Sequence, residues 1–197
     1  NRKGEKFMEI INGERLVLGT CYYPEHWDES LWRDDLKRML ENGIEVIRIA
    51  EFAWSKIERY EGVFNYDFYD KFLDLAEEMG MKVIFCTPTA TPPAWLTEKY
   101  PEVLNANIDG VLYRHGGRRH YNYNSPKYQE LTRIIVEKSA SHYAKHPAII
   151  GWQIDNEINC EKDEFYSESD TIAFRKFLMK KYGSIDALND VWGTNFW

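Results

Sequence analysis

The alternation of short apolar runs with helical segments is the feature that most constrains the fold of this chain. Apolar runs typical of buried strands occur at residues 16–21, 45–50, 82–86 and 148–154. Between them, apolar residues recur at helical spacing in residues 32–40, 68–79 and 127–145, and further helices are expected at 170–182 and 185–192. Strands and helices repeated in this order predict parallel strands joined by right-handed crossovers.

Two architectures fit this pattern, a doubly wound sheet and a (β/α)8 barrel. No strand is followed by a G-x-G-x-x-G or a phosphate-binding loop motif, which argues against the first. Each expected strand instead ends in polar or aromatic residues, namely Tyr22-Tyr23, Glu51-Phe52, Thr87-Pro88 and Asn156-Glu157. Barrel enzymes place catalytic groups at successive C-terminal strand ends. We therefore predict an α/β fold of the (β/α)8 TIM-barrel type.

The length indicates that the barrel is incomplete. A (β/α)8 barrel needs eight strands and typically about 250 residues, whereas this chain has 197 residues. We therefore expect residues 16–197 to be the N-terminal part of a catalytic domain, about the first four βα units, and residues 1–15 to be an N-terminal extension. Because open sheet edges find partners, the chain is expected to be a fragment or to receive its missing half from another chain.

Charge and composition exclude several kinds of partner. The net charge of −7 predicts no nucleic-acid partner. No run approaches the roughly 20 apolar residues that span a bilayer, and the N-terminal residues lack the apolar core of a signal peptide, so no membrane association is expected. Cys21, Cys86 and Cys160 are widely spaced and odd in number, which favours a reducing cytoplasmic location over a disulfide framework.

The stretch GWQIDNE, residues 151–157, carries an apolar strand directly into a carboxylate, an amide and a second carboxylate. Glycoside hydrolysis needs two carboxyl groups, one a proton donor and the other a nucleophile or base. Burial at the strand end is expected to desolvate Glu157 enough for it to hold a proton near neutral pH. For Glu157 alone, the alternative is an ordinary solvated carboxylate.

Five ordered stretches together resemble one enzyme family. They are GTCYYPEHW (19–27), RIAEFAWSKIE (48–58), TPTATPPAWL (87–96), GRRHYNYNSP (117–126) and GWQIDNE (151–157). The family is glycoside hydrolase family forty-two, the retaining β-galactosidases of the large (β/α)8 clan. The resemblance covers essentially residues 19–197, and five motifs at matching strand ends are far more specific than a lone Asn-Glu pair.

The resemblance implies a role for each of four residues. Glu157 corresponds to the general acid/base, which protonates the leaving oxygen and then deprotonates water. Asn156 corresponds to the residue that binds the sugar 2-hydroxyl, and Arg118 to the arginine that grips the galactosyl ring. Arg48 resembles the clan's arginine that hydrogen-bonds the nucleophile, and a structural ion pair is an equal alternative for it.

Other polar residues of these motifs are assigned supporting roles. Arg119 and His120 are expected to order their loop, and Glu51 and Asp155 either to support the residues that contact the substrate or to be structural. The family's nucleophile is a glutamate on the seventh strand, beyond residue 197, so this chain alone is expected to be inactive.

No metal and no cofactor are expected. Some family members bind structural zinc through a cysteine of the RRHY motif and a later cysteine cluster. In this chain the first of these positions is Asn122, and the later segment contains only Cys160. One nearby thiol does not make a four-thiolate site.

The leading hypothesis for the intact protein is a β-galactosidase that hydrolyses terminal non-reducing β-D-galactosides, of the lactose or galacto-oligosaccharide class, with retention. One alternative is an inactive carbohydrate-binding or regulatory fragment. Another is a glycosidase of the same clan that acts on arabinosides or fucosides. The resemblance also implies a homo-oligomer, because family members are often trimers.

Overall fold

The structure, a computed structural model, describes residues 16–158 and 160–194. The chain divides into two compact units, the first made of Asn1–Thr91 and Ile135–Asn156, the second of Pro92–Ile134 and Glu157–Trp197. The expected N-terminal extension, residues 1–15, lies outside the described residues. Among the described residues, no helix combines the length and apolar character needed to cross a membrane.

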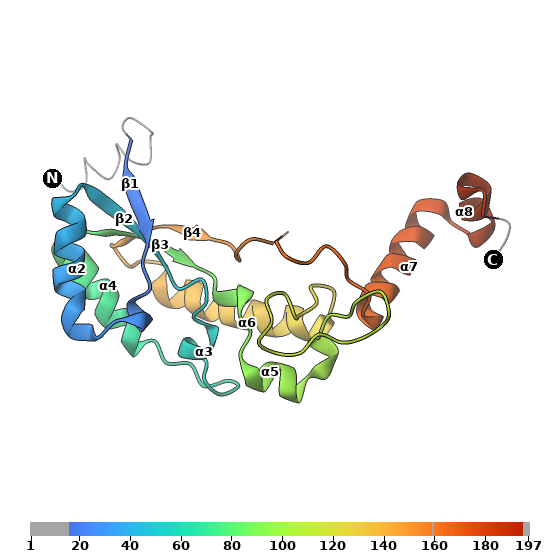
Figure 1. Ribbon diagram of the computed structural model, residues 1–197, viewed down its shortest axis with the longest axis horizontal. Coiled ribbons are helices and arrows are strands. Elements are labelled where there is room, and N and C mark those ends of the chain that lie inside the picture. The colour runs from blue at the N-terminus through green and yellow to red at the C-terminus, as the bar shows by residue number, and fades with distance from the viewer. Residues whose placement is uncertain (1–15, 159, 195–197) are drawn as a thin grey trace. The chain divides into compact units, whose positions relative to one another are not determined.

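Four parallel strands form one sheet in the first unit (Figure 1). They are β1 (Leu18–Cys21), β2 (Ile44–Ile49), β3 (Lys82–Cys86) and β4 (Ile149–Gln153), and they follow one another in the sheet as in the sequence. Helices α2 (Glu29–Glu41), α4 (Asp67–Met79) and α6 (Pro126–Tyr143) come between successive strands. The predicted parallel strands and crossover helices are therefore confirmed.

Local sequence signals set the ends of these helices. α2 begins after Asp28, whose carboxylate accepts the backbone N–H of Ser30 at 2.9 Å. α4 ends at Gly80, which adopts a left-handed φ of +83° that favours glycine. Ser125 Oγ accepts the N–H of Tyr128 at 3.4 Å, as expected for a helix that starts with proline.

The segment from Thr87 to Asn124 contains short helical elements. They are η2 (Pro88–Ala90), α5 (Ala94–Lys99) and η3 (Pro101–Val103), and the first unit also holds η1 (Pro24–His26) and α3 (Trp54–Ile57). All three 3-10 turns begin with proline, whose fixed φ suits a first helical position. The predicted last two helices are confirmed as α7 (Glu168–Tyr182) and α8 (Ile185–Trp192).

The core of the first unit is aromatic. Phe85 of β3 is fully buried, with its ring centroid 5.7 Å from that of Tyr69 on α4 and 4.8 Å from that of Tyr143 on α6. Trp32 of α2 meets Phe72 of α4 edge to face at 5.2 Å. These two helices therefore pack against each other beside the sheet, as Figure 1 shows.

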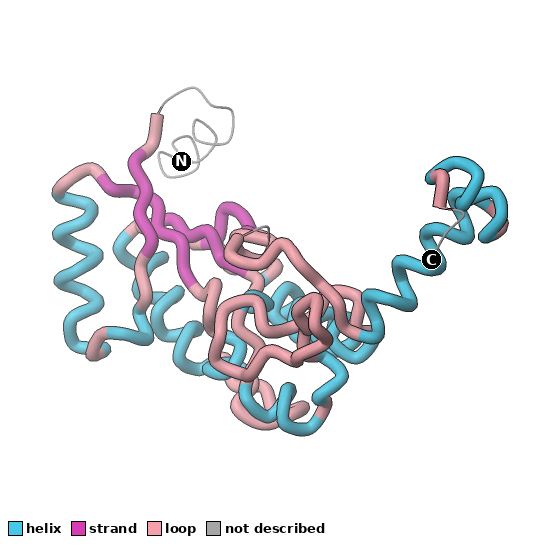
Figure 2. The backbone as a smooth tube through the Cα atoms, turned by 45° about the vertical axis from the view of Figure 1, so that its right-hand side comes forward, coloured by secondary structure: helices cyan, strands magenta, loops and turns pink. Residues whose placement is uncertain are grey.

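The second unit consists mainly of loops and helices (Figure 2). Asn122 is fully buried, and its amide nitrogen donates to the hydroxyls of Ser167 and Ser169 at the start of α7. Ser167 caps this helix in a reciprocal arrangement with Asp170. A polar network thus holds the loop of the GRRHY motif to α7.

We predict that Phe85→Ala lowers the free energy of unfolding by about 3–5 kcal/mol, because it removes a buried ring and leaves a cavity. Urea denaturation measures the change. Ile154→Ala is the matched control, since Ile154 is in the same unit and is 71% exposed. Equal losses for the two variants would contradict an aromatic core centred on Phe85.

Candidate active site at the strand ends

Polar side chains meet at the C-terminal ends of the strands in the first unit. Arg48 lies near the end of β2, Gln153 ends β4, and Glu51 follows β2. In the sheet register Cys21 pairs with Arg48, and Cys86 pairs with Gln153. The strands therefore end along one edge of the sheet, which gathers polar groups there as the barrel interpretation requires.

An ion pair between Arg48, whose side chain is 29% exposed, and the buried Glu51 is the centre of this group. Glu51 is fully buried, and its Oε1 accepts from Arg48 Nη2 at 2.7 Å and from the Tyr23 hydroxyl at 2.8 Å. Ala50 adopts a left-handed φ of +74° between the two paired residues. Among the described residues, Arg48 Nε and Glu51 Oε2 are buried without a hydrogen-bond partner. The pair thus has one donor, Arg48 Nε, and one acceptor, Glu51 Oε2, that make no hydrogen bond to the described residues.

Tyr23 supports the buried carboxylate. Burial, together with the hydrogen bond and the charge of Glu51, raises the pKa of Tyr23 to about 12. The hydroxyl therefore keeps its proton at neutral pH and acts as a donor to Glu51.

Gln153 connects Arg48 to Asn156. Its Oε1 accepts from Arg48 Nη1 at 2.8 Å, and its Nε2 donates to Asn156 Oδ1 at 3.2 Å and to the carbonyl oxygen of Asp155 at 2.9 Å. Asp155 has a φ of +54°, and its N–H donates to Thr87 Oγ1 at 2.7 Å. The backbone after β4 therefore turns sharply and is held in place, which is common at functional sites.

Glu157 and Arg118 form an ion pair in the second unit. Arg118 Nη2 donates to Glu157 Oε2 at 2.6 Å, and Nη1 donates to Glu161 Oε1 at 2.9 Å. Both glutamates have a positive φ, +45° and +68°. The guanidinium is thus held between two carboxylates, which suits it for binding oxygen atoms as a rigid fork of donors.

The structure groups the four predicted site residues in two pairs. Arg118 and Glu157 are in direct contact, and Arg48 reaches Asn156 through Gln153. The predicted burial of Glu157 is wrong, because its side chain is 52% exposed. Glu157 lies four residues beyond β4, on a loop, where its main partner is a charged arginine rather than apolar side chains.

Gln153 was missed by the sequence-based prediction. It is a polar residue at the end of an otherwise apolar strand, IIGWQ, and this was the signal that could have identified it. Arg48 makes, with Glu51, the ion pair that was its alternative assignment, and the Asp155 carboxylate accepts the backbone N–H of Asn156.

The loop before α6 is ordered by two residues that the sequence assigned to this role. Arg119 is buried, and its guanidinium donates to the hydroxyls of Tyr121 and Tyr123. The ring of His120, also buried, makes a 2.6 Å hydrogen bond through Nδ1 to the carbonyl oxygen of Gly117. These contacts confirm the loop-ordering assignment and fix the backbone on both sides of Arg118.

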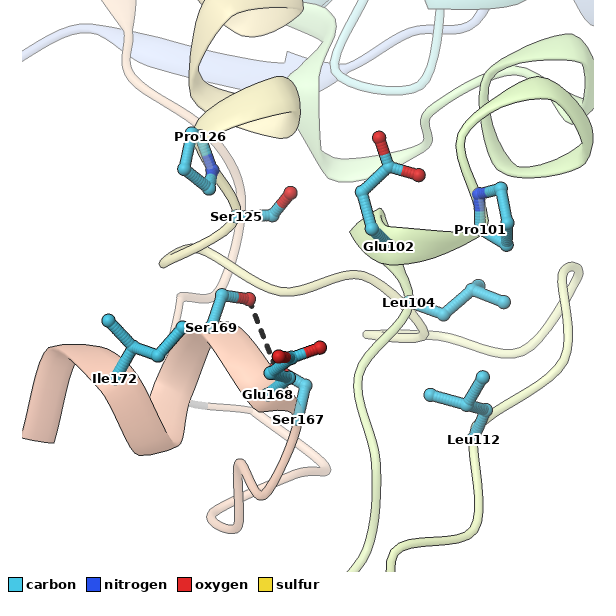
Figure 3. A pocket seen from close by; sticks show the side chains of 10 residues that line it. All are labelled: Pro101, Glu102, Leu104, Leu112, Ser125, Pro126, Ser167, Glu168, Ser169 and Ile172. Carbon is cyan, nitrogen blue, oxygen red and sulfur yellow. Dashed lines mark hydrogen bonds between the residues drawn. The ribbon is translucent and has the colours of Figure 1, made fainter.

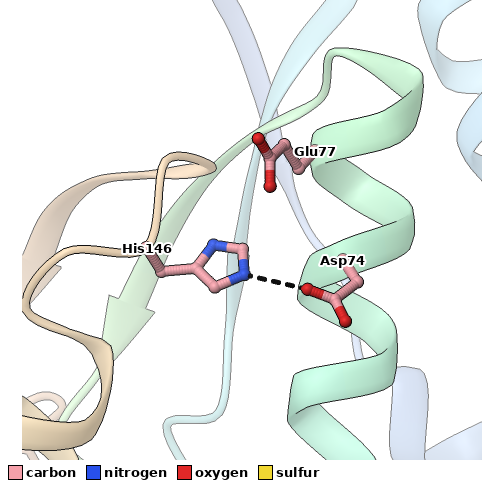
Figure 4. A group of neighbouring side chains, drawn as sticks. All are labelled: Asp74, Glu77 and His146. Atoms are coloured by element: carbon pink, nitrogen blue, oxygen red, sulfur yellow. Dashed lines mark ion pairs between the residues drawn. The ribbon is translucent and has the colours of Figure 1, made fainter.

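Among the described residues, one group of side chains has the composition of a metal site: Asp74, Glu77 and His146 (Figure 4). His146 Nδ1 accepts the N–H of Ala148 at 3.3 Å, and its Nε2 faces Asp74 Oδ1 at 3.5 Å. The group joins α4 to the residues after α6, and none of its members belongs to the predicted site.

A pocket in the second unit lies between the first turn of α7 and residues from η3 onward (Figure 3). Its lining is largely apolar, with Leu104, Leu112 and Ile172 among the side chains. The Ser167 and Ser169 hydroxyls there are 3.3 Å apart and are bonded to Asn122. Neither Arg118 nor Glu157 lines this pocket, so it is separate from the predicted catalytic groups.

A parallel sheet in sequence order, whose strands end in arginine, carboxylate and amide side chains, is the arrangement that the first βα units of a (β/α)8 barrel have. A sequence model of the family described as beta-galactosidase, glycoside hydrolase family 42, matches residues 21–197. The chain belongs to this family, and the resemblance seen in the five motifs is confirmed.

Curated relatives are named as β-galactosidases. The chain is 43% identical over 183 residues to beta-galactosidase Bga of Halorubrum lacusprofundi, an alignment that covers 92% of this chain and 26% of the relative. It is 44% identical over 182 residues to a beta-galactosidase of Thermus thermophilus, covering 92% of this chain and 28% of the relative. The chain thus spans about a quarter of the length of these relatives.

Solved structures confirm the predicted fold. The β-galactosidase of the psychrophilic Marinomonas ef1 matches with a TM-score of 0.89 and 44% identity over 92% of this chain and 28% of that one. The catalytic domain of a β-amylase from Paenibacillus polymyxa matches with a TM-score of 0.63 at 18% identity, over 91% of this chain and 51% of that one, and so shows the fold alone. β1 to β4 with their helices are the first βα units of a (β/α)8 barrel.

We predict that Glu51→Ala lowers the free energy of unfolding by about 2–4 kcal/mol, because Arg48 and Tyr23 lose a buried acceptor. Chemical denaturation at neutral pH measures the change. Glu78→Ala is the control, since it breaks the exposed pair with Arg33 at 2.8 Å and is expected to leave the midpoint unchanged within error. An equally small effect of Glu51→Ala would show that the buried pair is dispensable.

Proposed function

We propose that the complete gene product containing this chain hydrolyses terminal non-reducing β-D-galactosides with retention of configuration. The observation that carries the proposal is the 2.6 Å contact between Glu157 and Arg118, the two residues that the motifs assign to proton transfer and to sugar binding. The names of the relatives in the same family, all β-galactosidases, favour galactosides over arabinosides and fucosides.

In this proposal Glu157 protonates the leaving oxygen and then, as a carboxylate, deprotonates the attacking water. Arg118 donates to hydroxyls of the galactosyl ring. Its donors point at Glu157 and Glu161. A sugar that takes over these donors replaces the contact between Arg118 and Glu157.

Asn156 and Arg48 complete the proposed machinery. Asn156 binds the sugar 2-hydroxyl, a contact that strengthens in the transition state. Arg48 holds the nucleophile, and its buried Nε–H has no partner among the described residues, so it can donate to a further carboxylate. That nucleophile is a glutamate beyond residue 197, about 5–5.5 Å from the acid/base carboxyl group as a retaining mechanism requires.

We further propose that residues 16–197 are the N-terminal part of the catalytic domain and residues 1–15 an extension of it. A cytoplasmic location and a homo-oligomer, such as a trimer, belong to the same proposal. The three cysteines, Cys21, Cys86 and Cys160, are all unpaired thiols, which supports a reducing compartment.

We predict that Glu157→Gln in the complete protein lowers kcat/KM for lactose by about 100-fold or more, because it removes the general acid. Aryl galactosides with good leaving groups need less protonation, so their first step is expected to slow less. Steady-state and burst kinetics on both substrates separate the two steps. Retention of full activity on lactose would rule out this assignment.

Glu161→Gln is the matched control for that variant. It removes an equal charge from the same guanidinium, at a similar distance, without removing the proposed proton donor. Its loss on lactose is expected to be less than about tenfold. Similar losses for the two variants would show that the charge balance around Arg118, rather than proton transfer, explains the effect of Glu157→Gln.

We predict that the purified protein contains no stoichiometric zinc. The buried amide of Asn122 is committed to Ser167 and Ser169, and Cys160 is the one cysteine in the segment after Glu157. Elemental analysis by mass spectrometry after exhaustive dialysis measures the metal content. One zinc per chain, lost together with stability on chelation, would contradict the prediction.

A further inference from the structure

We propose that Gln153 is a positioning residue that fixes the direction in which the Asn156 carboxamide presents its donor end to the substrate. The proposal rests on the function proposed above, because it concerns the residue assigned to the sugar 2-hydroxyl. Its basis is the order of donors and acceptors along the hydrogen-bonded chain from Glu51 to Asn156 in the first unit.

Arg48 determines the orientation of Gln153. A guanidinium only donates hydrogen bonds. The Gln153 atom that faces Arg48 Nη1 at 2.8 Å is therefore the carbonyl oxygen, Oε1. The amide nitrogen of Gln153 must then point the opposite way, and the oxygen and nitrogen positions of this side chain follow from chemistry.

Gln153 in turn determines the orientation of Asn156. Its Nε2 has two protons, and two acceptors lie within reach, the carbonyl oxygen of Asp155 at 2.9 Å and Asn156 Oδ1 at 3.2 Å. Because Asn156 offers its oxygen to Gln153, its Nδ2 is the end directed away from Gln153. Reversing either amide would bring two donors or two acceptors face to face, in a place where Asn156 is 8% exposed.

Glu51, the first side chain of this hydrogen-bonded series, also has a fixed role as acceptor. Glu51 accepts from Arg48 and from Tyr23 at one oxygen, and both donors are protonated at neutral pH. Side chains at the ends of three strands, β1, β2 and β4, thus set the direction of a single amide. A substrate hydroxyl that meets Asn156 Nδ2 has to accept a hydrogen bond there, because an amide nitrogen only donates.

The test uses two variants of the complete protein. Gln153→Glu keeps the acceptor for Arg48 but cannot donate to Asn156, so the Asn156 amide is expected to reverse. Gln153→Met removes both contacts without adding charge. For each variant, kcat/KM is measured on an aryl β-galactoside and on its 2-deoxy analogue, and the ratio of the two values reports the contact to the 2-hydroxyl.

In the wild-type protein, removal of the 2-hydroxyl is expected to lower kcat/KM by about tenfold or more. Both variants are expected to lower kcat/KM on the parent galactoside by about 10- to 100-fold and to reduce the penalty for the 2-deoxy analogue to less than about threefold. An unchanged 2-deoxy penalty in both variants, whatever the loss of activity, would overturn the proposal.

Thr87→Val is the matched control. Thr87 holds the backbone of the same strand end: its Oγ1 accepts the N–H of Asp155, and its N–H donates to the carbonyl oxygen of Gln153. It is expected to lower stability, and activity on both substrates by the same factor, so the 2-deoxy penalty stays as in the wild-type protein. A reduced penalty in Thr87→Val would mean that general loosening of the strand end, rather than amide direction, explains the result.

Neutron diffraction from the deuterium-exchanged complete protein tests the inference without turnover. Deuterons on the Gln153 nitrogen directed at Asn156 Oδ1 support the proposal, and the reverse arrangement overturns it. The two proposals fail in different ways: absence of β-galactosidase activity in the wild-type protein contradicts the proposed function, whereas the amide direction is read from the nuclear density in either case.

Discussion

Arg48 and Glu51 share a 2.7 Å charge-assisted hydrogen bond at the end of β2, where the carboxylate has no access to water. Leaving the buried Glu51 charge unpaired in such a place is costly, which confines the two side chains to one arrangement. Tyr23 binds the same carboxylate oxygen, and Gln153 binds the other end of the guanidinium. The positions of polar groups at the ends of three strands therefore depend on this pair. They include the amide of Asn156, which is connected to Arg48 through Gln153.

The ion pair in the second unit differs from the first in its exposure to solvent. Arg118 and its partners Glu157 and Glu161 are each 42–53% exposed, so water screens their attraction. Such contacts contribute little to stability and exchange readily for other oxygen ligands. A pair with a fully buried carboxylate and a pair of exposed side chains suit different tasks: the first holds groups in place, and the second can exchange its partners for a substrate.

The sequence predicted most of the fold because its signals are local or repeat regularly. Periodic apolar residues placed the strands and crossover helices, while Gly80 and the Ser125-Pro126 pair marked helix ends. Contacts between distant residues were less predictable. Gln153 lies 105 residues from Arg48, and its importance depends on the register between neighbouring strands, since a slip of one residue would turn its side chain to the other face.

By itself, the sequence determined the order of the βα units, the family and the types of residue at each strand end. Apolar periodicity and ordered motifs are local features of the sequence, so they can be recognised without a structure. Only the tertiary structure decided which groups are buried and which partner each one has. Glu157, expected to be desolvated, is exposed and paired with Arg118, while Glu51 is fully buried. Burial and hydrogen-bond direction arise from contacts between segments far apart in sequence, which no local pattern specifies.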